Sequence, residues 1–222
     1  MKYEELNTLM IDYISTFFED INDPFIIHAG AHKGEVCIDN LAKKFPKAQV
    51  HSFEPCKESY NICLKRKIDE KVENLYLYNM GLSDMNEIID LNISTHSNTN
   101  STYKLDKLYG AYTHPQTGNV EKIKVIALKD WLPKNIYIDL LILNIEGCEL
   151  KALKGLGDKL KNIKCIHLEV NVYPFWENCA IFKDINEFLT ENGFYLAMNT
   201  KRRGYAFSDS QHNAVYIHKE LL

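Results

Sequence analysis

The sequence lacks three features that would assign it to a special class of protein. No apolar run approaches the roughly 18 residues that a membrane-spanning helix needs. The N-terminus has no basic region followed by an apolar one, so no signal peptide is indicated. The six cysteines include no Cys-x-x-Cys pair, which argues against a zinc site and against a disulfide framework. We therefore expect reduced thiols in a cytoplasmic protein without a membrane span.

The chain also lacks an excess of positive charge. Its formal net charge is −4, which argues against a protein that binds the phosphate backbone of a nucleic acid. The one tight basic cluster, Lys201–Arg203, is typical of a solvated loop. With 222 residues, 45% of them hydrophobic and 25% charged, the chain fits one globular domain with a substantial core.

The stretch from Phe25 to Glu54 is the most informative part of the sequence. An apolar run enters the glycine-containing segment 28–34, a helical pattern follows, and a second apolar run ends at Glu54. This order predicts one βαβ unit of a nucleotide-binding sheet. Gly30 and Gly34 permit a sharp turn close to a ligand, and Glu54 lies where such folds place an acceptor for ribose hydroxyls. The alternative interpretation is an ordinary glycine turn with a solvated glutamate nearby.

The other segments alternate between strands and helices. The continuously apolar run 140–143 indicates a parallel strand that is covered on both faces. Residues 3–20 show helical spacing, and this helix is expected to cover the sheet or to contact a partner chain in a homodimer. The polar segment 94–119 shows no period and is expected to be a lid or substrate loop, with disorder as the alternative. The pattern predicts an N-terminal helical extension, 1–24, and one doubly wound α/β domain, 25–222.

Polar residues follow five of the predicted strands. In open α/β sheets, ligands bind beyond the carboxyl ends of the strands, so these five segments are expected to meet in one crevice. The third of them includes 81–84, which we expect to be a turn. The five segments are 28–34, Glu54, 79–84, 144–147 and 169–171.

Six short segments resemble the FkbM-type methyltransferases, which use S-adenosylmethionine. The similarity extends from about Phe25 to His218 and includes the Ser/Thr-rich loop around 98–103. It implies a Rossmann-like class I methyltransferase fold, a mostly parallel doubly wound sheet with an antiparallel C-terminal strand. It also implies methyl transfer to a hydroxyl group of a sugar or another small biosynthetic product. The segments are 28–34 (His-Ala-Gly-Ala-His-Lys-Gly), 53–55 (Phe-Glu-Pro), 81–84 (Gly-Leu-Ser-Asp), 143–147 (Leu-Asn-Ile-Glu-Gly), 153–155 (Leu-Lys-Gly) and 168–170 (Leu-Glu-Val).

The resemblance also implies where the ligands lie. The 28–34 turn would pass under the methionine moiety of the cofactor, Glu54 would bind the ribose hydroxyls, and the 79–84 turn would border the adenine. Asn144, Glu146 and the 94–119 loop would face the acceptor. The cofactor-binding residues implied in this way are His28, Gly30, Ala31, His32, Gly34, Glu54, Pro55, Asn79, Gly81 and Ser83.

Two positions depart from the family pattern. The family usually has aspartate where His28 and Asn144 stand, and the first of these helps to hold the ammonium group of the cofactor. A neutral imidazole or an amide gives that ammonium no full countercharge, and Asn144 is unable to act as a general base. Glu146 is then our first candidate for the base, or for a ligand of a divalent metal, and Glu169 is the second. The alternative role for both acids is the capping of the following helix or loop.

Three functions stay open from the sequence. The first is an O-methyltransferase that acts on a small hydroxylated molecule. A divalent metal would help to activate the hydroxyl group, but the sequence has no motif for its ligands. The second is a methyltransferase fold that binds a ligand without turnover, which His28 and Asn144 motivate. The third is an NAD-dependent enzyme, which the Gly30-x-x-x-Gly34 spacing argues against because the full Gly-x-Gly-x-x-Gly motif is absent.

Overall fold

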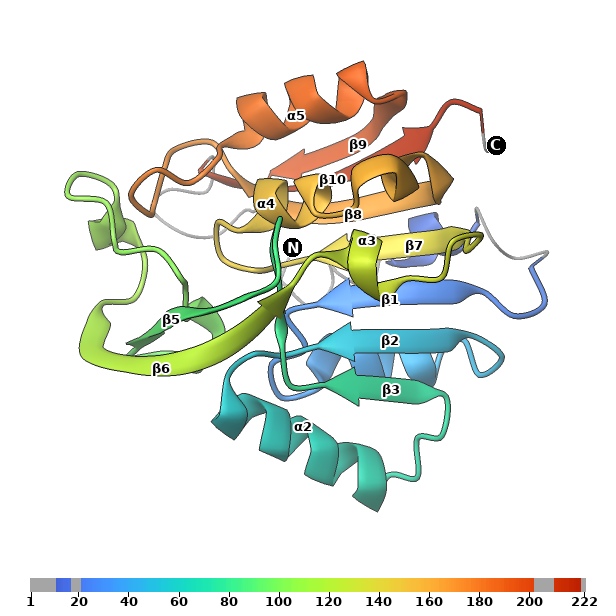
Figure 1. Ribbon diagram of the computed structural model, residues 1–222, viewed down its shortest axis with the longest axis horizontal. Coiled ribbons are helices and arrows are strands. Elements are labelled where there is room, and N and C mark those ends of the chain that lie inside the picture. Colours follow the sequence, from blue (N-terminus) through green and yellow to red (C-terminus); the bar gives the residue numbers. More distant parts are fainter. Residues whose placement is uncertain (1–10, 17–20, 202–209, 221–222) are drawn as a thin grey trace.

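The computed structural model describes residues 11–16, 21–201 and 210–220, in which helices and strands alternate along most of the chain (Figure 1). The strands of the main sheet are β1 (Phe25–Ala29), β2 (Gln49–Phe53), β3 (Leu75–Tyr78), β7 (Ile138–Leu143), β8 (Ile163–Asn171), β9 (Phe194–Lys201) and β10 (Gln211–His218). The helices are η1 (Glu35–Ala42, a π-helix), α2 (Lys57–Asp69), α3 (Leu128–Trp131), α4 (Glu149–Lys154), α5 (Phe182–Glu191) and the 3₁₀-helices η2 (Ser97–Thr99), η3 (Gly110–Tyr112) and η4 (Gly157–Asn162).

The main sheet has seven strands in the order β3-β2-β1-β7-β8-β10-β9. The pairs from β3 to β8 are parallel, and β10 is antiparallel to both of its neighbours. The chain leaves β1 towards β2 and β3 and later returns to β7 on the other side, so the direction of winding reverses between β1 and β7. The predicted doubly wound sheet with an antiparallel C-terminal strand is therefore confirmed, and its ligand crevice is expected beside the ends of β1 and β7.

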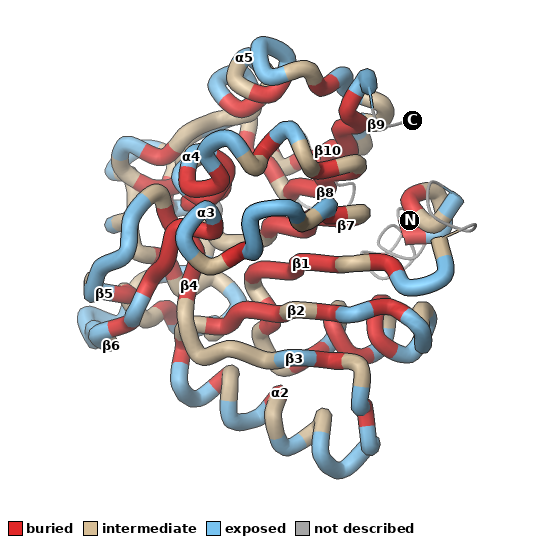
Figure 2. The backbone as a smooth tube through the Cα atoms, turned by 45° about the vertical axis from the view of Figure 1, so that its right-hand side comes forward, coloured by how far each residue is buried: buried red, intermediate tan, exposed pale blue. Residues whose placement is uncertain are grey.

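Two apolar layers cover the two faces of the sheet (Figure 2). One face packs against α3, α4, η4 and α5, and the other packs against η1 and α2. The predicted apolar face of η1 is confirmed, since Ile38, Leu41 and Ala42 are buried. The described residues of the predicted N-terminal helix join the second layer, because Ile11 and Ile14 are buried within it. The described part of this helix, residues 11–16, thus covers the sheet of its own chain. The rest of the predicted 3–20 helix, from which a homodimer was also expected, lies outside the described residues.

A second, three-stranded sheet extends from the main domain and corrects two sequence-based expectations. It has the order β4-β6-β5, with β4 (Gly81–Leu82), β5 (Glu87–Ser94) and β6 (Gln116–Ile126). Gly81 and Leu82 were expected in a turn, but they pair in parallel with Val125 and Ile126. The predicted 94–119 loop is shorter than expected, because β6 already begins at Gln116. Residues 116–119 were not predicted as part of a strand, because their polar side chains show no alternation with apolar ones. This part of β6 is largely exposed to solvent.

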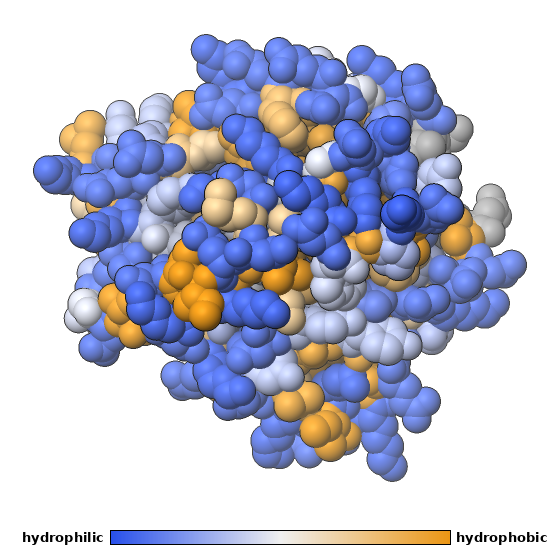
Figure 3. Space-filling model, in the orientation of Figure 1, coloured by the Kyte–Doolittle hydropathy of each residue, from blue (hydrophilic) through white to orange (hydrophobic). Residues whose placement is uncertain are grey.

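The face of the molecule shown in Figure 3 is mainly hydrophilic. On this face, apolar side chains form small separate groups (Figure 3). Within the described ranges, no helix is long and apolar enough to cross a membrane. All six cysteines lie in described segments and none forms a disulfide, which agrees with the expected reduced thiols.

Candidate active site

A cleft of about 1220 Å³ lies at the carboxyl ends of the strands, where the crevice was expected. The ends of β1, β2 and β7 form one side, and the loop 95–115 lies over it. The structure brings together nine of the residues that the sequence indicated. These are Gly30, Ala31, His32, Glu54, Pro55, Gly81, Asn144, Glu146 and Glu169.

The turn after β1 is shaped by contact with the end of β7. Gly30 has a φ of +93°, and a Cβ at this position would lie 2.0 Å from the carbonyl oxygen of Asn144. The backbone N–H of Asn144 donates to the carbonyl of Ala29 at 3.1 Å. Gly34 also has a positive φ, but its missing Cβ leaves room for Ile38 and Cys63. Both glycines therefore permit close packing of the protein itself, and Gly30 also lines the cleft.

Glu54 ends β2 and is only 7% exposed. Its carboxylate accepts hydrogen bonds from the backbone N–H of His32 at 2.8 Å and of Cys56 at 2.9 Å. Burial raises the pKa of Glu54, while these two N–H groups act in the opposite direction. The carboxylate thus fixes the β1 turn against the end of β2 and stands at the floor of the cleft.

The turn after β7 is held by a buried acid that the sequence analysis missed. Glu146 has a φ of +55° and Gly147 one of +97°, so the turn contains a non-glycine residue in the left-handed region. The Glu149 carboxylate accepts the backbone N–H groups of Ile145 at 2.9 Å and Gly147 at 3.0 Å, on either side of Glu146. Burial raises the pKa of Glu149 to about 7. Glu149 therefore holds the strained turn that carries Glu146 into the cleft.

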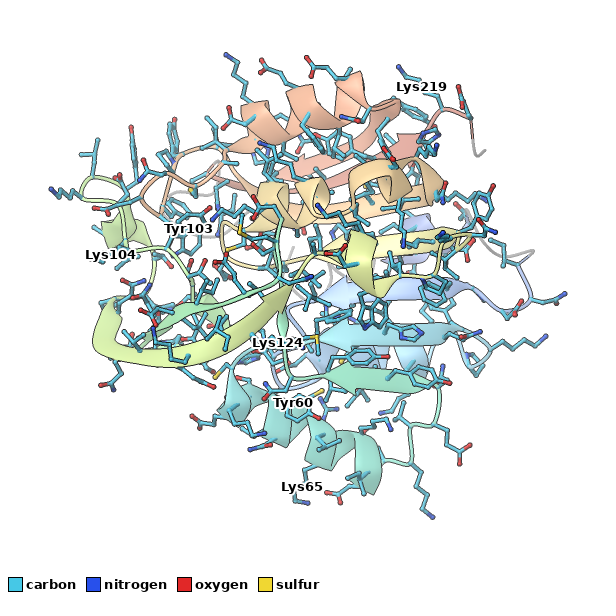
Figure 4. The ribbon with its side chains drawn as sticks, viewed as in Figure 1. Tyr60, Lys65, Tyr103, Lys104, Lys124 and Lys219 are labelled. Carbon is cyan, nitrogen blue, oxygen red and sulfur yellow. The ribbon has the colours of Figure 1, made fainter. Side chains whose placement is uncertain are left out.

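The loop 95–115 is attached to both sides of the cleft. Ser97 Oγ lies 2.8 Å from His32 Nε2, beside the β1 turn. Ser101 Oγ donates to the carbonyl of Glu146 at 2.7 Å, beside the β7 turn. Tyr103 extends from the loop towards α4, and the ammonium of Lys151 lies 5.1 Å from the centre of its ring (Figure 4). The loop thus forms a roof over the cleft, joined to both turns by hydrogen bonds.

Four predicted cofactor residues do not line the cleft. His28 is buried and its Nδ1 lies 2.8 Å from Ser52 Oγ. Asn79 donates to the carbonyls of Glu54 and Pro55, so it supports the end of β2 from behind. The remaining two, Gly34 and Ser83, are also buried within the protein.

The structure separates the two histidines of the 28–34 segment. His28 contacts Ser52 in the core, while the ring of His32 contacts Glu35 and Ser97. These are independent polar contacts. Among the residues that the structure describes, no group of three or more His, Cys, Asp or Glu side chains is arranged to hold a metal ion.

Three residues of the site were missed from the sequence: Ser97, Ser101 and Glu149. The two serines lie in a segment without a period, where nothing distinguishes a serine that contacts the cleft from its neighbours. Glu149 follows Glu146 by three residues near the start of α4, and this spacing was the available signal. A carboxylate at the first position of a helix can reach back to the backbone N–H groups of the preceding turn, as Glu149 does.

The comparisons with known proteins agree with this geometry. The model of the methyltransferase FkbM domain matches residues 28–196. A methyltransferase of Sordaria araneosa, sdnD, is 25% identical over 201 residues, which cover 78% of this chain and 74% of that protein. Among solved structures, magnesium protoporphyrin IX methyltransferase from Synechocystis, with bound S-adenosylmethionine, has a TM-score of 0.53 at 11% identity and covers 96% of this chain and 80% of its own.

A second structure, a putative rRNA methylase from Clostridium thermocellum, has a TM-score of 0.55 at 11% identity, with 94% of this chain and 93% of that chain covered. At this level of identity both structures show the fold alone, the class I methyltransferase fold. The family model spans most of the sequence and includes the β1 turn, Glu54 and the β7 turn. The chain therefore belongs to the FkbM family of S-adenosylmethionine-dependent methyltransferases.

Proposed function

We propose that the protein transfers a methyl group from S-adenosylmethionine to a hydroxyl group of a sugar or a similar small biosynthetic product. The observation that carries this proposal is the composition of the roof over the cleft. Hydroxyl and amide side chains both donate and accept hydrogen bonds, as the hydroxyl groups of a sugar do. The roof residues of this kind are Ser97, Asn98, Thr99, Asn100, Ser101, Thr102 and Thr113.

The floor of the cleft suits the nucleoside part of the cofactor. Each carboxylate oxygen of Glu54 accepts one backbone N–H, and a carboxylate oxygen has room for a second donor. Glu54 and Pro55 are therefore assigned to the ribose, and the turn with Gly81 to the adenine. Asn79 and Ser83 would contribute to cofactor binding indirectly, by holding the backbone of the residues that line the cleft.

The β1 turn is assigned to the methionine moiety. Gly30, Ala31 and His32 line the cleft there, while Gly34 shapes the turn from inside. His28 does not fit the expected contact with the ammonium group, because burial lowers its pKa to about 3 and leaves the imidazole neutral. The residues present thus fit most of the cofactor, but another acid must provide this countercharge.

The proposed reaction depends mainly on positioning. The cofactor, when bound, supplies an electrophilic methyl group, and the protein has to hold the acceptor hydroxyl in line with it. Glu146 is assigned the removal of the hydroxyl proton, because its turn lies in the cleft and is fixed by Glu149 and Ser101. Asn144 can orient the acceptor by hydrogen bonds, and Glu169 is the second candidate for proton removal.

A ligand-binding protein without turnover is the second candidate function. Two observations favour it: His28 is neutral and buried where the family usually has an acid, and Asn144 has no proton-accepting carboxylate. Both candidates predict that the cofactor binds, so only turnover separates them.

Titration calorimetry with S-adenosylmethionine, followed by methyl transfer to a panel of hydroxylated sugars, tests the proposal. We expect micromolar binding that Glu54→Ala abolishes. The exposed Glu58→Ala on α2 is the matched control and should bind as the wild type does. Glu146→Gln should lower the rate of methyl transfer by about 10²- to 10⁴-fold while leaving cofactor binding intact. Folded protein that binds no S-adenosylmethionine would contradict both candidates, and binding without transfer to any acceptor would favour the second.

A further inference from the structure

A small cavity of about 40 Å³ lies beside the cleft, behind the end of β1. It shares lining residues with the cleft, including Gly30, Asn144 and Glu169, so the two spaces adjoin at the carboxyl ends of β1 and β7. Glu169 is the only carboxylate among the residues that line the cavity, all of which are described, and none of them is lysine or arginine. The other lining residues are Ile11, His28, Val36, Asn40, Ile142, Leu143, His167 and Asn213.

The two histidines of the cavity add no positive charge. Burial lowers the pKa of His28 to about 3, with a smaller contribution from His167. Burial also lowers the pKa of His167 to about 4, although its hydrogen bond to Asn213 acts in the opposite direction. At neutral pH both imidazoles are therefore uncharged, and Glu169 determines the charge of this region.

Buried polar atoms beside Glu169 have no partner in the protein. His167 Nε2 lies 3.1 Å from Asn213 Oδ1, but His167 Nδ1 and Asn213 Nδ2 make no hydrogen bond to any described residue. Asn213 is paired with Glu169 across β8 and β10, and His167 lies two residues before Glu169, on the same face of the sheet. Buried polar groups are nearly always paired. These atoms therefore indicate a place for a polar group of a ligand.

Three other acids of the cleft lie near the β1 turn. Glu54 accepts two backbone N–H groups, Glu35 contacts the ring of His32, and Asp39 forms an ion pair with Arg66 at 3.0 Å. None of these three acids lines the small cavity. Glu169 is the acid that both spaces share.

We propose that Glu169 holds the primary ammonium group of the methionine moiety of S-adenosylmethionine, in place of the acid that the family usually has at position 28. An ammonium group has three N–H donors and no acceptor, so it matches the Glu169 carboxylate and His167 Nδ1, which is an acceptor because the Nε2–H of the same ring donates to Asn213 Oδ1. This inference rests on the proposed function, because it requires the cofactor in the cleft. It gives Glu169 a binding role and leaves proton removal to Glu146.

The test compares two ligands that differ at the amino-acid end. S-adenosylhomocysteine carries the ammonium group, whereas 5′-methylthioadenosine has the same nucleoside and sulfur but no amino-acid group. Both are titrated by calorimetry into the wild type, Glu169→Gln, Glu169→Asp and Glu58→Gln. The last variant is the control, since it also removes one negative charge but from the exposed surface of α2.

We expect Glu169→Gln to lower the affinity for S-adenosylhomocysteine by about 10- to 100-fold, which is the range for the loss of a charge-assisted hydrogen bond. Its affinity for 5′-methylthioadenosine should stay within about twofold of the wild-type value. Glu169→Asp should retain part of the lost affinity, and Glu58→Gln should bind both ligands as the wild type does. An unchanged affinity for S-adenosylhomocysteine in Glu169→Gln, or an equal loss for both ligands, overturns the inference alone. Wild-type protein that binds neither ligand overturns the proposed function and this inference together.

Discussion

Gly30 is the residue at which the two central strands meet. Two features disfavour any other residue at this position. The backbone φ is +93°, and a Cβ would lie 2.0 Å from the carbonyl oxygen of Asn144. Gly118 in β6 separates the two effects, because its φ of +87° is similar but no atom lies within 4 Å of its Cβ position. Gly118→Ala is expected to cost about 1–2 kcal/mol of unfolding free energy, from backbone strain alone.

Gly30→Ala is expected to cost at least about 2 kcal/mol more than Gly118→Ala, because the β1 and β7 turns must also separate. Urea denaturation of both variants measures the difference. Equal losses in the two variants would mean that the contact between Gly30 and Asn144 contributes little. The same separation would disturb the cleft, so we also expect Gly30→Ala to lower the affinity for the cofactor.

Glu149 is the residue whose charge is expected to give the fold its pH dependence. Its ordinary pKa is 4.5, and burial raises the pKa to about 7 in the folded chain. Between these values the folded state binds more protons than the unfolded state, so the contribution of Glu149 to stability falls as the pH rises from about 4.5 to 7. Glu149→Gln removes this dependence. The stability of the variant relative to the wild type should rise over this range by on the order of 3 kcal/mol.

Unfolding free energies measured between pH 5 and pH 8 test this expectation. Glu169, Cys148 and Cys179 are the other titratable groups close to Glu149, and they are unchanged in the variant. Glu187→Gln on the surface of α5 should follow the wild type at every pH, since Glu187 is 61% exposed. A constant difference between Glu149→Gln and the wild type would show that the carboxylate does not titrate in this range.

The loop 95–115 is the element that completes the cleft, and its contact with the β7 turn depends on one hydroxyl group. Ser101 Oγ donates to the carbonyl of Glu146 at 2.7 Å and accepts the N–H of Tyr103 at 3.1 Å. Ser101→Ala leaves both partners unpaired, which is expected to cost about 1–3 kcal/mol locally. Hydrogen exchange of the backbone amides of the loop should become roughly 10- to 100-fold faster.

Thr117→Ala is the matched control for this loop. Thr117 Oγ1 also donates to a backbone carbonyl, that of Ile93, and accepts the N–H of Asn119, but it is exposed and lies away from the cleft. This variant should leave the exchange of the loop amides unchanged. If amide exchange in the loop became similarly faster in both variants, the β5–β6 hairpin as a whole would hold the loop in place. The hydrogen bond between Ser101 and Glu146 would then contribute little.

At the scale of the whole molecule, the sequence predicted what local periodicity and strand ends determine. The βαβ unit, the apolar run of β7 and the convergence of Glu54, Asn144 and Glu146 in one cleft follow from patterns within short segments. The separate β4-β6-β5 sheet did not follow, because its strands are partly exposed and its paired residues lie 22 (Ser94 and Gln116) to 44 (Gly81 and Val125) positions apart in the sequence. The backbone contacts of Glu149 and Ser101 were also hidden, since they depend on which carbonyl or N–H the fold brings near.

The charge of the cleft as a whole limits the acceptor. Five carboxylates line it, those of Glu35, Asp39, Glu54, Glu146 and Glu169, and no lysine or arginine is among its described lining residues. A phosphate group in such a cleft meets several like charges at close range, which costs several kcal/mol. We therefore expect a neutral polyol or an amine-bearing sugar to be methylated, with a kcat/KM at least about tenfold above that of its phosphate ester. Because exposed charges are screened, the difference should shrink between 0.05 and 0.5 M salt. A phosphorylated acceptor that reacts faster than its neutral parent would contradict this expectation and would place basic residues from outside the described lining at the acceptor.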